Sequence, residues 1–292
     1  MGRHKTPLRY PGGKQRLTPF VREVLACNGG AANYVEPYAG GAGVAMELLL
    51  SRDVRRVYLN DSSRNIFAFW HAVKFDAENL CRLISRASLS LNEWDRQREI
   101  ARNPEQHDLL TLGFSTFYLN RCNRSGVLTA GVIGGKSQDG RWRIDARFPR
   151  NELISRIEAI AGMADQISIS DLDAEQFIVR KVNSLRATTL VYCDPPYYER
   201  AKRLYLNTYE PDDHARVAKI IQGKLRHPWL VSYDAHSHIE HLYKDRRKFM
   251  YTIQYSAITS CPGREIFIFS DGLVIPRQSV LPYISSALTS TR

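Results

Sequence analysis

Hydrophobic and polar positions follow two alternating spacings over the first 75 residues. Apolar runs of strand length begin at residue 33 ("NYVE") and residue 54 ("VRRVYLND"), and both runs end in an acidic residue. Helical spacing follows at residues 14–27, in the stretch up to residue 50 and again at 62–75, where Ser62 is the expected N-cap. This β-α-β-α order predicts a doubly wound, mostly parallel sheet.

The alternation stops at about residue 75 and returns at about residue 149. Between them, residues 91–103 and 107–120 have amphipathic helical spacing, and a glycine-rich basic stretch follows. Further on, helices are expected at 150–164, 174–182, 213–226 and 237–244, and strands at 166–171, 188–193, 228–234, 248–255 and 264–270. The expected fold is therefore α/β: a sheet domain from residues 1–74 and 149–292, with a mainly helical insertion at 75–148.

Length, hydropathy and cysteine usage narrow the class of protein. The 292 residues suffice for one domain with a sizeable insertion. No apolar run approaches the roughly 20 residues that span a bilayer, and the N-terminus lacks a signal-peptide pattern. The five cysteines are widely spaced without a C-x-x-C pair, and the eight histidines lack paired ligand spacing. We expect no membrane association, no metal site and a reducing, cytoplasmic location.

The charge balance favours a polyanionic partner. The net charge is +11 and the pI about 9.5, which points to nucleic acid, although the charge would also serve solubility alone. Basic residues outnumber acidic ones most clearly between Asn120 and Arg150, and a second basic run covers Lys244 to Lys248. The first run lies in the insertion, which therefore reads as an inserted binding element.

The stretch "LVYCDPPYYER" ends a buried strand in an unusual way. Two prolines stop the strand and stiffen the turn at its carboxyl end, where open α/β sheets bind ligands. Asp194 and the carbonyl of Pro195 are two fixed acceptors for an NH2 group, and Tyr197 offers a ring to the molecule that carries it. The alternative is a proline-stiffened loop with a capping aspartate.

Acidic residues at other strand ends suggest a nucleoside. The turn "EPYAGGAG" joins a strand to a helix through glycines that allow close approach of a ligand. Asp61 ends the next strand and Asp171 a later one; carboxylates there accept hydrogen bonds from ribose hydroxyls and an exocyclic amine. Each of these acids is also a plausible helix cap.

These motifs together resemble the Dam-like, alpha-class DNA adenine-N6 methyltransferases. The resemblance covers nearly the whole chain and keeps the family's order: "LRYPGGK", "EPYAGGAG", "YLND", "FYLNRCNRSGVL", "CDPPYYERAKRLYLNTY", "DDH" and "WLVSYD". It implies a Rossmann-like methyltransferase sheet, S-adenosylmethionine as cofactor, double-stranded DNA as substrate and residues 75–148 as the target-recognition domain. By carry-over the catalytic residues are Asp194, Pro195, Pro196 and Tyr197. The cofactor-binding residues are Tyr10, Lys14, Glu36, Pro37, Tyr38, Gly40, Gly41, Gly43, Asp61, Asp171 and Asp194.

The resemblance leaves the target sequence open. The insertion departs from the target-reading segment of GATC-specific members, so GATC specificity is not carried over. The expected DNA-binding residues are Asn120, Arg121, Asn123, Arg124, Lys136, Arg141 and Arg143. Relatives in this family are often monomeric, which favours a monomer here. Whether a restriction enzyme or another defence-system partner accompanies the protein stays open.

Three alternatives to DNA adenine methylation stay open at this point. The same fold acts on N4 of cytosine or on adenine in RNA, although Asp194 favours adenine at the family level. A non-catalytic DNA-binding relative is the third, and the intact "DPPY", Asp61 and Lys14 argue against it.

Overall fold

The computed structural model describes residues 5–9, 14–199, 209–255 and 261–276. A seven-stranded sheet runs in the order β3-β2-β1-β4-β5-β7-β6. The five neighbouring strands β3, β2, β1, β4 and β5 pair in parallel. Strand β7 lies between β5 and β6 and is antiparallel to both. The strands are β1 (Asn33–Glu36), β2 (Arg56–Asn60), β3 (Ile167–Ser170), β4 (Thr189–Cys193), β5 (Trp229–Asp234), β6 (Arg247–Tyr255) and β7 (Cys261–Phe269). The predicted doubly wound, mostly parallel α/β fold is confirmed.

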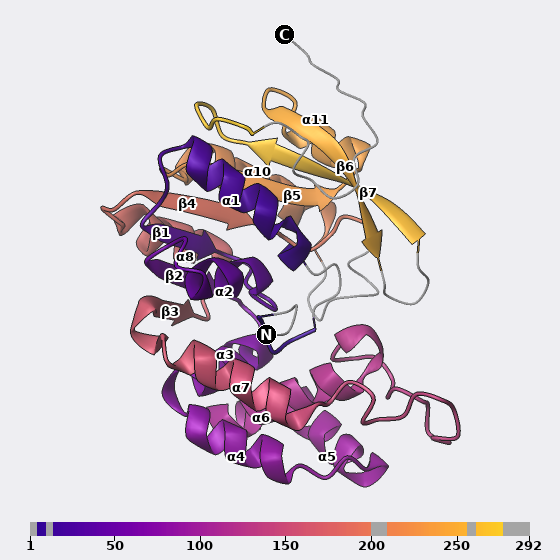
Figure 1. The fold of residues 1–292 in the computed structure, drawn as a ribbon. Helices are drawn as coiled ribbons and strands as arrows, with labels where there is room; N and C mark the ends of the chain where they lie inside the picture. The colour runs from indigo at the N-terminus through magenta and orange to yellow at the C-terminus, as the bar shows by residue number, and fades with distance from the viewer. Residues whose placement is uncertain (1–4, 10–13, 200–208, 256–260, 277–292) are drawn as a thin grey trace.

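Helices cover both faces of the sheet, and a further group of helices lies beyond one end (Figure 1). The α-helices are α1 (Thr18–Cys27), α2 (Gly43–Leu50), α3 (Arg64–Phe75), α4 (Ala77–Arg86), α5 (Leu91–Arg102), α6 (Leu109–Cys122), α7 (Arg150–Ala161), α8 (Ala174–Arg180), α10 (Pro211–Lys224) and α11 (Ser237–Leu242). The 3₁₀ helices are η1 (Lys14–Leu17), η2 (Pro104–Gln106), η3 (Arg124–Gly126), η4 (Ala164–Gln166) and η5 (Val182–Ser184). None of the helices in these ranges combines the length and apolar character needed to cross a membrane.

The central strands are apolar on both faces because both faces are covered. Along β4, Leu190 and Tyr192 join one buried cluster with α1 and α2, while Val191 and Cys193 join another with α8, α10 and α11. Parallel strands covered on both sides lose the polar alternation of half-exposed strands. This explains why "TTLVYC" reads as one continuous apolar run.

The insertion is helical, as its amphipathic spacing predicted. Helices α4, α5 and α6 lie within residues 75–148, and α3 and α7 pack against α6 and α4 from the sheet domain. Figure 1 shows this helical group below the sheet, with residues 5–9 between the two parts. The exact boundaries, residues 75 and 148, stay a prediction.

One sequence expectation about α3 is corrected. The helix has Ser63, not Ser62, at its N-cap position, and the Ser63 side chain makes no capping hydrogen bond. The carboxylate of Asp61 accepts the Ser63 N–H instead, at 3.0 Å. An aspartate side chain commonly accepts a hydrogen bond from the amide two residues ahead, and Asp61 rather than Ser62 makes the side-chain hydrogen bond at this turn.

A glycine sets the distance between α3 and α6, and we expect its replacement to destabilise the protein. A Cβ on Gly113 would lie 2.6 Å from the carbonyl oxygen of Ala68. Gly113→Ala should therefore lower the free energy of unfolding by about 1–3 kcal/mol, because the two helices must separate. Chemical denaturation measures this.

The matched control is Gly223→Ala in α10. A Cβ there meets nothing within 4 Å, so the change should be neutral or stabilising by about 0.5–1 kcal/mol through helix propensity. Equal effects of the two substitutions would contradict the close packing of α3 on α6.

Candidate active site

Acidic side chains stand at the carboxyl ends of four adjacent parallel strands. Glu36 ends β1, and Asp61, Asp171 and Asp194 directly follow β2, β3 and β4. The order β3-β2-β1-β4 places these ends along one edge, with the reversal of strand order between β1 and β4. Open α/β sheets bind ligands at such a reversal.

The carboxylate of Asp194 is anchored through one of its two oxygens. Its Oδ1 accepts a hydrogen bond from Ser232 at 2.5 Å and lies 3.3 Å from the ammonium of Lys14. Ser232 is itself held by the Tyr192 hydroxyl at 2.8 Å. No group in the described part of the chain donates to Oδ2. Burial raises the pKa of Asp194, while Lys14 opposes that rise.

The Lys14 ammonium forms an ion pair and a hydrogen bond with other side chains of the site. Its Nζ lies 2.7 Å from Oε2 of Glu265 and donates to the Tyr197 hydroxyl at 3.2 Å. Burial alone would lower the pKa of Lys14, but the carboxylates of Asp194 and Glu265 outweigh it and raise that pKa. Lys14, which was expected to bind the cofactor, thus lies beside two of the predicted catalytic residues, Asp194 and Tyr197.

Tyr197 lies inside the protein. Its exposed fraction is 0%, and its hydroxyl donates to Oε1 of Glu265 at 2.7 Å. The Lys14 ammonium lies 5.1 Å from the centre of its ring. The ring therefore does not form an open surface at the site.

The two prolines lead into a backbone clamp. Pro195 is buried and Pro196 half-buried. The amides of Tyr198 and Glu199, which follow Tyr197, donate to the carboxylate of Asp234 at 2.8 and 3.0 Å. Asp234 ends β5 and was not among the predicted site residues. The strand-end position that singled out the other acids also applied to "WLVSYD".

The glycine turn after β1 adopts a left-handed backbone. Gly40 has φ of 45° and Ala42 of 44°, which only glycine adopts without strain. The carbonyls of the turn are held from outside: Thr6 donates to Gly41 at 2.5 Å and Trp70 to Gly40 at 2.9 Å. A Cβ on Gly43 would meet the Gln15 side chain at 3.1 Å.

Glu36 supports this turn from beneath. Its Oε1 accepts the N–H of Ala45 at 3.1 Å, and its exposed fraction is 5%. Burial raises the pKa of Glu36 to about 8, so the side chain is largely protonated at neutral pH. Glu36 therefore holds the first turn of α2, next to the glycine turn at residues 40–43.

Asp61 holds both the residue that precedes α3 and the glycine turn. One oxygen accepts the Ser63 N–H, as above, and the other accepts the Gly40 N–H at 2.8 Å. Burial raises the pKa of Asp61 to about 6. The preceding Asn60 was missed by the sequence reasoning: its amide bonds Pro37 at 3.1 Å and Leu172 at 2.9 and 3.0 Å. It therefore fixes the turns after β1 and β3 to each other.

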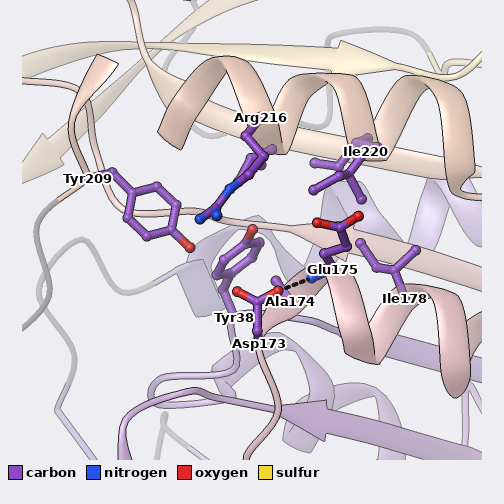
Figure 2. A pocket seen from close by; sticks show the side chains of 10 residues that line it. Tyr38, Asp173, Ala174, Glu175, Ile178, Tyr209, Arg216 and Ile220 are labelled. Carbon is purple, nitrogen blue, oxygen red and sulfur yellow. Dashed lines mark hydrogen bonds between the residues drawn. The ribbon is translucent and has the colours of Figure 1, made fainter. Parts of the chain in front are cut away.

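A pocket opens beside these turns. Its walls come from Tyr38 after β1, from the start of α8 and from α10, and it holds about 270 Å3 including space open to solvent. Figure 2 shows Tyr38 and Tyr209 converging with Arg216 over Asp173, whose carboxylate accepts the Glu175 N–H. Asp171 lies just before this wall and is exposed. The pocket thus borders the carboxyl ends of β1 and β3.

Three of the predicted DNA-binding residues are buried. Asn120 donates to the carbonyls of Arg9 and Gly126 at 2.6 and 2.9 Å. Asn123 donates to two loop carbonyls and accepts from Trp94 at 2.7 Å. These amides hold the loop after α6 from inside.

Arg121 is also an interior group. Its Nε donates to the Arg147 carbonyl at 2.6 Å, and its exposed fraction is 7%. Burial lowers the pKa of Arg121 to about 9. The structure thus separates the predicted set into an interior group and a surface group.

The surface group shares the segment between α6 and α7 with an exposed tryptophan. Arg124, Lys136, Arg141 and Arg143 are exposed, and Trp142 is 56% exposed with the Arg141 guanidinium 5.1 Å from its ring. Arg147 lies 5.8 Å from the same ring. Figure 1 shows the long loop between α6 and α7 extending away from the helices. The sequence signal that was overlooked is "RWR", an aromatic between two cations.

Arginines of the second basic run, Lys244 to Lys248, make contacts that stabilise the sheet. Arg247 donates to the carbonyls of Ser270 and Leu273 at 3.2 and 2.5 Å, and Arg246 pairs with Asp271. These cations therefore brace β6 against the end of β7. Tyr10, expected near the cofactor, lies outside the described residues.

Comparison with known proteins identifies relatives. The family model for D12 class N6 adenine-specific DNA methyltransferases matches residues 10–258. The type II methyltransferase M.MjaIII of Methanocaldococcus jannaschii is 23% identical over 237 residues, which cover 73% of this chain and 77% of that protein. Two structures of the rRNA methyltransferase aviRa from Streptomyces viridochromogenes align over 89% of this chain and 86% and 85% of theirs. Both are 14% identical, with TM-scores of 0.41 and 0.37, and at those scores the likeness supports no conclusion.

Proposed function

This chain belongs to the D12 class of N6 adenine-specific DNA methyltransferases, and from that premise we propose which of its residues bind the methyl donor, hold the target adenine and contact the DNA. The chain is an adenine-specific DNA methyltransferase. The site at the carboxyl ends of β1 to β4 is where we place the reaction.

The methyl donor we propose is S-adenosylmethionine. The chemistry of the strand-end residues fits it: each oxygen of Asp61 accepts one backbone N–H, which leaves lone pairs for ribose hydroxyls. The left-handed turn through Gly40 gives backbone access for the methionine part. Tyr38 lines the pocket that we assign to the purine, and Asp171 lies two residues before Asp173 in its wall. When bound, this cofactor supplies an electrophilic methyl group.

Asp194 is the residue we assign to the target amine. Because Lys14 and Ser232 hold Oδ1, the carboxylate cannot rotate freely, and Oδ2 is the oxygen that accepts an N6 hydrogen. The carbonyl of Pro195 accepts the second hydrogen, since proline fixes the direction of this turn. The nitrogen lone pair is then aimed at the methyl group, and orientation supplies much of the rate. Asp194 Oδ2 is also placed to take the proton that N6 releases after methylation.

The adenine must leave the duplex to reach this site, at a cost of a few kcal/mol. Stacking on an aromatic ring returns roughly 1–3 kcal/mol per base. For Tyr197 to provide that surface, neighbouring groups must first move aside, because its ring is buried. We therefore assign Tyr197 a second task, which is to fix Lys14 beside Asp194 through its hydroxyl.

The insertion, residues 75–148, is the part we propose to bind double-stranded DNA. Its exposed cations are placed to contact phosphates, and such contacts make affinity fall steeply with salt. The buried Asn120, Arg121 and Asn123 would shape the loop without reaching bases. The name of the archaeal relative supports a further proposal, that this enzyme acts beside a restriction enzyme.

Trp142 is the residue in the loop whose loss we expect to weaken DNA binding most. An exposed indole flanked by guanidinium groups stacks on bases, a contact worth roughly 1–3 kcal/mol. Trp142→Ala should therefore lower DNA affinity by about 5- to 150-fold, measured by fluorescence anisotropy at fixed salt.

The control is Phe75→Ala, which removes another exposed aromatic, 62% exposed at the end of α3. Its DNA affinity should match the unmodified protein. If Trp142→Ala and Phe75→Ala bind DNA alike, the basic loop does not use its tryptophan.

The observation that carries the proposed function is the anchored Asp194 carboxylate at the end of β4. The test is modified-base sequencing of DNA from a methylation-deficient bacterium that expresses the protein, beside an Asp194→Ala control. N6-methyladenine in one short motif, absent from the control, is the expected result and also gives the recognition sequence. Modified bases in neither sample would overturn the assignment of a DNA substrate to this site.

A further inference from the structure

Glu265 is a fully buried acid next to the catalytic motif. It lies on β7, where it is paired in register with Asp234 of β5 and Tyr251 of β6, and its exposed fraction is 0%. A buried carboxylate costs much free energy unless charges and hydrogen bonds compensate it. Its neighbours should therefore reveal what it holds.

Among the described residues, three donors from different parts of the chain converge on this carboxylate. Oε1 accepts from the Tyr197 hydroxyl at 2.7 Å, and Oε2 accepts from Lys14 at 2.7 Å and from the Tyr251 hydroxyl. Lys14 comes from the N-terminal segment, Tyr197 from the catalytic motif, and Tyr251 from the edge of the sheet. Glu265 thus joins the two site segments to a rigid strand.

Lys14 is shared unequally between two carboxylates. Its Nζ is 2.7 Å from Glu265 and 3.3 Å from Asp194. A shorter ion pair with Glu265 leaves Asp194 less neutralised, because the two acids compete for one cation. A carboxylate that keeps more of its charge is the stronger acceptor for an amine hydrogen.

From this geometry we propose that Glu265 is a positioning residue of the methyl-transfer site. It holds Lys14 and Tyr197 at fixed places beside Asp194 and keeps Lys14 from pairing fully with Asp194. The proposal rests on the role proposed above for Asp194. In this proposal Glu265 acts on the reaction through Lys14 and Tyr197 and does not touch the substrate.

A merely structural role predicts a different outcome. If Glu265 only stabilises β7, its replacement lowers the melting temperature and the folded fraction, and the remaining folded enzyme works normally. A positioning role changes the folded enzyme itself. The rate of transfer and its pH dependence distinguish the two.

The experiment is Glu265→Gln, which keeps the shape and removes the charge. Its single-turnover methylation of DNA from a methylation-deficient bacterium is followed by mass spectrometry. The rate should fall about tenfold to a hundredfold per folded molecule, as a small misplacement of reacting groups does. KM for DNA should change by less than about threefold, since the DNA-binding loop is remote. Because Glu265 raises the pKa of Asp194, the acid limb of the rate profile should move to lower pH.

The matched control is Glu23→Gln on α1, which removes one negative charge from an exposed side chain outside the insertion. It should behave as the unmodified enzyme does. A Glu265→Gln enzyme with the unmodified rate and pH profile per folded molecule would overturn the proposal. An inactive unmodified enzyme would instead defeat the proposed function, so the two failures are distinguishable.

A second variant keeps the test open if Glu265→Gln does not fold. Tyr251→Phe removes one donor to Glu265 without altering Lys14, Tyr197 or Asp194. It should shift the rate in the same direction by a smaller factor, about two- to fivefold. An unchanged rate and pH profile in this variant would also overturn the proposal.

Discussion

Asp194→Asn should lower the rate of methyl transfer by about 10³-fold, within the range seen when an enzyme loses a positioned electrostatic or proton-accepting group. The reason lies in the anchored oxygen. Lys14 and Ser232 both donate to the Oδ1 position, so the amide oxygen of asparagine must take that place. Its NH2 group then occupies the Oδ2 position, where two donors, the amide and the N6 amine, would face each other.

The same substitution should leave the fold and DNA binding intact. Burial already raises the pKa of Asp194, so a neutral side chain there removes an unfavourable desolvation, and Lys14 keeps its pair with Glu265. Single-turnover rates, melting temperature and DNA affinity are measured together. The control is Asp245→Asn, an exposed acid in the turn after α11. A rate within tenfold of the unmodified enzyme would remove Asp194 from the role of amine acceptor.

The sheet and its acidic edge were predictable from the sequence because they depend on local periodicity. Apolar runs ending at Glu36, Asp61 and Asp194 place acids at strand ends, and parallel strands bring those ends to one edge. The insertion of β7 between β5 and β6 was not predicted. Strand order at an antiparallel edge depends on which neighbours pack together, and a run such as "REIFIFS" carries no such information.

The hydrogen-bond partners of the interior polar groups could not be predicted from the sequence, because those partners lie far away along the chain. Asn120 and Asn123 were expected to bind DNA because they lie at the start of a basic segment, yet Asn120 bonds Arg9, which lies 111 residues away. Glu265 is bonded by Lys14 across 251 residues and by Tyr197 across 68. A single acidic residue in a strand is expected to face solvent unless its partners are known. The hydrogen bonds that join Glu265 to Lys14 and Tyr197 could therefore be recognised only from the folded structure.

That network makes Lys14 the cation on which two carboxylates depend, the buried Glu265 and the partly exposed Asp194. Lys14→Met keeps the length of the side chain and removes its charge. Removing one partner of a buried ion pair costs about 3–5 kcal/mol, and we expect a loss of that size in the free energy of unfolding. Methylation should fall with it, because Asp194 loses the group that fixes Oδ1.

The destabilisation of Lys14→Met should depend on pH in a defined direction. Burial raises the pKa of Asp194 and Lys14 opposes this, so removing Lys14 raises it further. A folded state whose carboxyl pKa lies above its unfolded value holds a proton that the unfolded chain releases, and its stability therefore falls as pH rises between the two values. The stability difference from the unmodified enzyme should be largest near pH 8 and smaller near pH 5, measured by denaturation at both values.

A second substitution tests whether the loss comes from the unpaired charge. The double variant Lys14→Met with Glu265→Gln removes one of the two carboxylates that lost their cation, so it should recover much of the stability without recovering activity. Lys219→Met, an exposed lysine on α10, is the control for loss of a positive charge and should be nearly neutral. If the double variant is as unstable as the sum of its two single variants, Lys14 and Glu265 act independently, and the shared-cation network at Asp194 is wrong. Recovery of stability would instead show that the charges of Lys14, Glu265 and Asp194 stabilise the folded site as one coupled group. Asp194 is the member of that group with the largest exposed fraction.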